Sequence, residues 1–198
     1  HSDNNENRTS KSKNALDVDG RFADILEIGM DLAVRLIDIA LLKHQTVNWR
    51  SVLGNHNEHT AVFMNKYVKA YYRNEPRVIV HDKPSAVYYH QFGTVLLGMT
   101  HGHQIKADKL GEVMSVDCQS IWSSTKHRYF LTGHLHHQSV KEYPSCVVET
   151  FRTITGKDTW HFSSGYRSAQ DMNCIIYHKL YGEVSRNKVH LAKLNDLA

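Results

Sequence analysis

Proline, cysteine and long apolar runs are all scarce in this 198-residue chain, and each scarcity excludes something. The three prolines and the lack of any Pro/Gly/Ser-rich stretch leave no linker, so we expect a single domain over residues 1–198. The three cysteines lie far apart and form no Cys-x-x-Cys word, which excludes a zinc knuckle and a disulfide framework and favours a reducing cytosol. No apolar run reaches the roughly 18–20 residues of a membrane span, so no membrane partner is expected.

Charge and the first residue set weaker limits. The formal net charge of +4 permits a polyanionic partner without requiring one, and no Lys/Arg cluster is dense enough to form a nucleic-acid-binding tail. The chain begins with His rather than Met, so the lack of a visible signal peptide says little about targeting. The compositional anomaly is the number of histidines: 15 of them, dispersed along the chain rather than gathered in a tag.

Two stretches have the apolar spacing of helices, and strands dominate the rest. Apolar residues recur at helical spacing from Gly20 to Lys43 and over residues 58–73, while residues 105–120 look helical or mixed. The polar opening, residues 1–13, is expected to be a loop. Short apolar and β-branched runs predict strands at 49–53, 77–81, 86–92, 94–99, 128–132, 138–143, 146–150, 160–163, 173–180 and 188–194. This order predicts an α/β sandwich with mixed sheets.

Three short sequence motifs that contain histidine, called words below, stand out, each directly after an apolar run. They are Gly54-Asn55-His56-Asn57-Glu58, Thr100-His101-Gly102-His103 and Gly133-His134-Leu135-His136. Asn offers a carbonyl oxygen and His a ring nitrogen to a metal, and the ends of adjacent strands can bring such donors to one point. In an extended segment, His134 and His136 would share a face and could serve two metals about 3.5–4 Å apart, the arrangement that clamps a phosphoryl transfer.

Each word has a plainer interpretation when taken alone. Gly-Asn-His occurs by chance, and His101 and His103 could be satisfied imidazoles of a surface loop, with His103 alternatively lying behind the metal ligands. The remaining histidines are expected to be surface or packed residues. Arg167, on a Ser/Gly-rich loop, could bind a substrate phosphate, although a solvated loop is the better explanation of this residue. The three words in this order favour the metal interpretation.

At this point the chain resembles the calcineurin-like metallophosphoesterases. Their pattern is Asp-x-His, Gly-Asp-x-x-Asp, Gly-Asn-His-Asp/Glu, a lone His and Gly-His-x-His, and the last three words match at 54–57, 101 and 133–136, with Asn57 in place of the acidic residue. The first two words are absent from this sequence. The opening, residues 1–8, is similar to the segment after Gly-Asp in the SbcD-like DNA-repair exonuclease and phage branch. The resemblance therefore implies a β-sandwich of two mixed sheets flanked by helices, with the N-terminal strands and half of the site expected upstream of His1.

The resemblance also implies a role for each matching residue. Asn55, His101 and His134 would bind one divalent metal, and His136 would bind a second one. His56 would be the general acid for the leaving oxygen, and His1 would assist near the phosphate. The nucleophile would be a metal-bound hydroxide, with Mn²⁺ as the first choice of ion and Fe or Zn²⁺ as alternatives.

Three functions are compatible with these words. The first is a metal-dependent phosphodiesterase that acts on DNA in the cytoplasm, or in the host cytoplasm if the protein is phage-encoded, with homodimerisation as in related nucleases. The second is the same chemistry on a small phosphomonoester, cyclic nucleotide or nucleotide pyrophosphate. The third is a catalytically inactive binding module, which the missing Asp-x-His and Gly-Asp words would favour.

Overall fold

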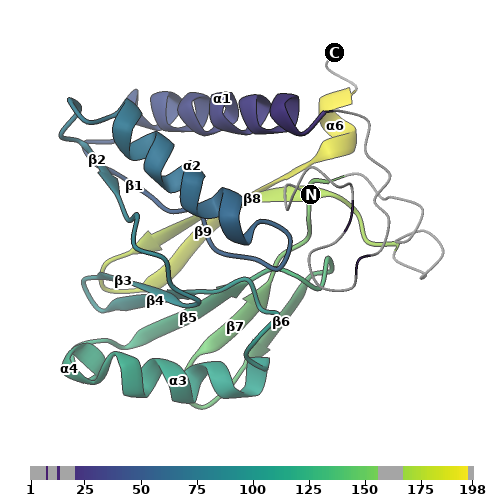
Figure 1. Ribbon diagram of the computed structural model, residues 1–198. Helices are drawn as coiled ribbons and strands as arrows, with labels where there is room; N and C mark the ends of the chain where they lie inside the picture. Colours follow the sequence, from purple (N-terminus) through teal and green to yellow (C-terminus); the bar gives the residue numbers. More distant parts are fainter. Residues whose placement is uncertain (1–7, 9–12, 14–20, 156–166, 196–198) are drawn as a thin grey trace. The chain divides into compact units, whose positions relative to one another are not determined.

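The computed structural model describes Arg8, Lys13, residues 21–155 and residues 167–195 (Figure 1). The chain divides into two compact units, His1–Ala86 and Val87–Ala198, and each is described by itself. The single-domain interpretation stays a prediction. No described helix is both long enough and apolar enough to cross a bilayer.

The first unit is built from two helices and a short parallel sheet. The order is α1 (Phe22–Leu41), β1 (Val47–Trp49), α2 (Glu58–Tyr71) and β2 (Val78–Val80), with β1 and β2 paired in parallel. The helices predicted over residues 20–43 and 58–73 are confirmed, because their apolar spacing gives each helix a face to bury. The hydrophobic core of this unit contains the buried side chains of Ala33, Ile37, Val68 and Tyr72, against which Trp49, Val78 and Val80 also pack.

The strand predicted over residues 49–53 is wrong in its extent. The strand ends at Trp49, and the backbone of Ser51 bonds to a side chain instead of to a strand. Asn65, which is buried on α2, accepts a hydrogen bond from the Ser51 N–H (2.8 Å) and donates one to the Ser51 carbonyl (3.0 Å). One amide therefore satisfies both backbone groups and fixes the segment that leads to Gly54.

The second unit contains a mixed five-stranded sheet of order β3-β4-β5-β7-β6. The central strands β4 (Val95–Met99), β5 (His127–Thr132) and β7 (Val147–Thr150) are parallel, and β3 (Tyr88–Phe92) and β6 (Ser139–Glu142) are antiparallel edges. These strands lie within the predicted runs or one residue beyond them. The α/β class with a mixed sheet is confirmed.

A short helical layer covers one face of this sheet. It consists of η1 (Ala107–Lys109), α3 (Leu110–Asp117) and α4 (Gln119–Trp122), which Figure 1 shows along the face of the strands. Leu110 and Met114 of the helix pack with Leu96 and Phe130 of the sheet in a fully buried cluster. Gly98 allows this close packing, because a Cβ there would lie 2.8 Å from both Met114 Cε and Phe130 Cε2.

The chain ends in a β-hairpin of β8 (Asp171–His178) and β9 (Gly182–His190), followed by α6 (Leu191–Asn195). The strand predicted over residues 188–194 is therefore wrong in its second half, where Leu191 and Leu194 have the three-residue spacing of a helix. The hairpin is tied to the large sheet by Arg186, whose Nη2 donates to Glu149 Oε2 of β7 (2.7 Å). The hydrogen bonds of Arg186 to Glu183 and to Glu149 raise the pKa of its guanidinium group. The strand predicted at 160–163 lies outside the described residues.

Candidate functional site

The parallel pair β4–β5 places two of the histidine words at one edge of the sheet. Parallel strands end on the same side, and the pairing continues beyond both of them. The Thr100 N–H donates to Leu131 O (3.2 Å), and the Gly133 N–H donates to His101 O (3.1 Å). The loop after β4 and the loop after β5 are therefore held side by side by their backbones.

Three imidazole rings gather where these loops meet. The ring centroids lie 5.2 Å apart for His101 and His134, 5.3 Å for His101 and His103, and 5.9 Å for His103 and His134. All three residues are half-buried. His103, which the sequence placed behind the ligands or on the surface, is a member of this cluster; the His-x-His spacing after β4 is the signal that pointed to it. The assignment of His101 and His134 as metal ligands remains a prediction.

The loop after β5 does not have the extended conformation that the sequence predicted. His134 and His136 have φ angles of 65° and 55°, in the left-handed region that residues with a Cβ rarely adopt. The Leu135 N–H donates to Gly133 O (2.7 Å), so the loop turns tightly instead of running straight. The prediction that His134 and His136 share one face, as they would in an extended strand, is therefore wrong. A residue held in this region has a strained backbone, and residues strained in this way cluster at functional sites.

The third word lies in the first unit, in the loop before α2. Asn57 Oδ1 accepts from the Gly54 N–H (2.7 Å), and Asn57 Nδ2 donates to Val52 O (3.4 Å). The amide thus closes the loop that carries Asn55 and His56, both half-buried. A carboxylate at position 57 could accept from Gly54 but could not donate to Val52. Asn57, which stands where the calcineurin-like pattern has Asp or Glu, therefore makes a contact within the loop that an acidic residue could not make.

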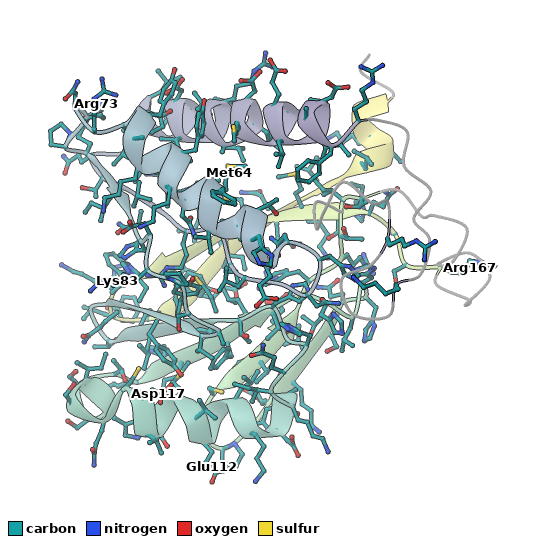
Figure 2. All side chains as sticks on the ribbon, in the orientation of Figure 1. Met64, Arg73, Lys83, Glu112, Asp117 and Arg167 are labelled. Carbon is teal, nitrogen blue, oxygen red and sulfur yellow. The ribbon has the colours of Figure 1, made fainter. Side chains whose placement is uncertain are left out.

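The other predicted site residues fall outside these loops. Arg167 is exposed and precedes β8; it is labelled in Figure 2. Its phosphate contact stays a prediction. His1 lies outside the described residues. Asn55 and His56 belong to the first unit, whereas His101, His134 and His136 belong to the second.

The cysteines do not contribute reactive thiolates where their titration is resolved. Burial raises the pKa of the Cys118 thiol, and the neighbouring Asp117 raises it further. Burial likewise raises the pKa of the Cys146 thiol, despite a hydrogen bond with Ser145. Both thiols therefore stay protonated at neutral pH, as expected for cysteines that pack in the core.

The donor chemistry of the cluster fits a borderline divalent metal, since imidazole suits Fe²⁺ and Zn²⁺, whereas Mn²⁺ prefers oxygen ligands. Within residues 21–155 and 167–195, however, no group of three or more His, Cys, Asp or Glu side chains is arranged to hold an ion. The centroid distances agree with this, because rings in mutual contact need not point their nitrogens at one centre. The cluster supplies nitrogen donors without completing a site by itself.

No protein-family model matches the chain, and no curated protein matches it. Among solved structures, the chain is similar to Vps29 complexed with Zn²⁺ from Entamoeba histolytica, with 15% identity, a TM-score of 0.40 and coverage of 79% of this chain and 88% of that one. A single mutant of Vps29 from the same organism gives 16% identity, a TM-score of 0.35 and coverage of 83% and 89%. Similarities this weak assign neither a family nor a function to this chain.

Proposed function

We propose that this chain is a metal-dependent phosphoesterase of the calcineurin-like superfamily that hydrolyses phosphodiester bonds in DNA, as in the SbcD-like and phage branch. The observation that carries the proposal is the meeting of His101 and His134, 5.2 Å apart, at the carboxyl ends of adjacent parallel strands. The left-handed φ angles of His134 and His136 support it, because strain of this kind persists where function requires it.

The proposed roles correspond to the three words. Asn55, His101 and His134 hold one divalent ion and His136 holds a second, with Mn²⁺ preferred and Fe or Zn²⁺ as alternatives. Such ions supply a water activated for attack at neutral pH. His56 protonates the leaving oxygen, and Asn57 keeps its loop closed through Gly54 and Val52.

Substrate contacts involve the remaining residues. Arg167, which is exposed, binds a substrate phosphate, and His1 assists near the reacting phosphate. The net charge of +4 suits a polyanionic substrate. A homodimer acting in the cytoplasm, or in the host cytoplasm for a phage enzyme, completes the proposal.

Hydrolysis of bis-p-nitrophenyl phosphate with added Mn²⁺ tests the chemistry, using the full natural protein. We expect turnover that falls by about 10²–10⁴-fold in His56→Ala, as removal of a general acid predicts, and at least as far in His136→Ala. His44→Ala, an exposed histidine in the loop after α1, is the matched control and should keep its rate.

The pattern of substrates separates the alternatives. Cleavage of single- or double-stranded DNA supports the nuclease. Cleavage of mononucleotides with DNA left intact contradicts it and assigns a small-substrate phosphatase. A natural protein that hydrolyses none of these substrates with Mn²⁺, Fe²⁺ or Zn²⁺ is a binding module, and the enzyme proposal then fails.

A further inference from the structure

A compact group of charges surrounds Asp171 at the start of β8. The Asp171 side chain is only 1% exposed, and its Oδ2 accepts a hydrogen bond from Arg152 Nη1 at 2.6 Å. The same oxygen lies 3.9 Å from Lys188 Nζ and 4.0 Å from His190 Nδ1. Asn173 Nδ2 donates to the other carboxylate oxygen (3.1 Å). The carboxylate of Asp171 thus lies within 4.0 Å of two cationic side chains and a histidine.

This group carries a net positive charge. Burial pushes the pKa of Asp171 upward, but the Arg152 hydrogen bond and the Lys188 charge outweigh burial and hold the pKa below its ordinary value. Asp171 is therefore ionised at neutral pH, and it offsets only one of the two charges of Arg152 and Lys188. Both cationic side chains remain 26% exposed, so the excess charge is within reach of a ligand in solution.

Arg152 also has a donor to spare. Its Nη1 is engaged by Asp171, but its Nε–H is buried and has no hydrogen-bond partner among the residues that the structure describes. A buried guanidinium N–H without an acceptor is unfavourable, and an anion that accepted from it would remove that cost. Phosphate oxygens are the acceptors that the planar fork of arginine binds best.

The charged group adjoins the loop of His134 and His136. Lys188 Nζ donates to Oε1 of Gln138, which lies two residues after His136 (2.7 Å). Arg152 comes directly after Phe151, whose N–H donates to the carbonyl of Thr132, two residues before His134 (2.9 Å). Both ends of the strained loop are therefore anchored to residues that belong to the charged group or lie next to it.

We propose that Arg152 and Lys188 form a phosphate-binding subsite beside the His134–His136 loop, with His190 at its rim. The subsite holds a phosphate group of the substrate other than the one that reacts. Asp171 orients Arg152 and sets the net charge. The identity of the ligand as a substrate phosphate rests on the proposed function, whereas the binding of phosphate does not.

Fluorescence anisotropy of the full chain with a labelled oligothymidylate, in EDTA, tests the subsite without metal chemistry. We expect Lys188→Met to weaken binding about five- to tenfold and to lower the slope of log K against log salt by roughly 0.7. Arg152→Lys, which keeps the charge and a hydrogen bond to Asp171, should also weaken binding, because the fork is lost. Lys109→Met is the matched control: Lys109 pairs with Glu112 on the helical layer, and its loss removes the same charge.

The outcomes are distinct. Equal binding by Lys188→Met and Lys109→Met, or no measurable binding by the wild type, overturns the subsite. If inorganic phosphate competes with the oligonucleotide for the wild type but not for Lys188→Met, the site is assigned to a single phosphate group. If Lys188→Met weakens oligonucleotide binding but inorganic phosphate does not compete, the site is assigned to a polynucleotide strand. If hydrolysis is absent while Lys188-dependent binding persists, the subsite stands and the proposed function fails. If hydrolysis is present and binding does not depend on Lys188, the proposed function stands and the subsite proposal fails.

Discussion

The left-handed backbone at His134 gives a prediction in which glycine and alanine exchange their usual order of stability. Both His134→Gly and His134→Ala remove the imidazole, so any difference between them reports only the backbone. The φ angle of 65° places a Cβ against the following carbonyl, which glycine avoids. We therefore expect His134→Gly to be more stable than His134→Ala, and the same order at His136, where φ is 55°.

The size of the difference depends on two opposed contributions. A residue with a Cβ in the left-handed region loses about 1–2 kcal/mol relative to its ordinary conformation. Glycine loses about 0.5–1 kcal/mol through the larger entropy of its unfolded state. The net result is a glycine variant about 0.5–1 kcal/mol more stable than the alanine variant. At Glu112, inside α3, the left-handed contribution is absent, and the alanine variant should be more stable by about 0.5–1 kcal/mol.

Urea unfolding followed by circular dichroism measures these free energies, in EDTA so that no ion contributes to stability. The four variants at positions 134 and 112 form a matched set in one unit. The strain argument is refuted if His134→Ala is as stable as His134→Gly or more so, because a relaxed loop would then show the order found on the helix.

Other contacts give three further expected outcomes. Asn65→Ala, which leaves two backbone groups without their partner, should cost about 2–3 kcal/mol in urea unfolding, against at most about 0.5 for the exposed Asn74→Ala; equal costs would contradict this. Arg186→Met strands the carboxylate of Glu149, whose side chain is 6% exposed, and should cost about 3 kcal/mol, with much of the loss recovered in the double variant with Glu149→Leu. Hydrogen bonds from two lysines lower the pKa of Asp82 to about 2, so its stabilisation is present above pH 3.8 and lost as pH falls through about 2; an NMR midpoint near 3.8 would refute this.

The sequence predicted those parts of the fold that local spacing determines. Apolar residues at helical intervals identified α1 and α2, and short apolar runs identified β4 and β5 within a residue of their ends. Because parallel strands end at one edge, the strand ends also indicated where the words containing His101 and His134 would meet.

Loop geometry and distant partners could not be predicted in this way. The turns at His134 and His136 depend on backbone conformation, which leaves no spacing signal in a short polar word. The early end of β1 depends on Asn65, 14 residues along the chain, which bonds to Ser51 in place of a strand. The link from Arg186 to Glu149 spans 37 residues. Such contacts are set by packing between elements, so no local pattern marks them.

Binding of Mn²⁺ to the full natural protein, followed by the electron paramagnetic resonance of the free ion, tests the central claim most directly. The claim is that the cluster of His101 and His134 supplies ligands to a divalent ion. We expect the wild type and His44→Ala to bind Mn²⁺ with equal affinity, and both His101→Ala and His134→Ala to bind at least about tenfold more weakly. Unchanged Mn²⁺ affinity in His101→Ala and His134→Ala would contradict the claim.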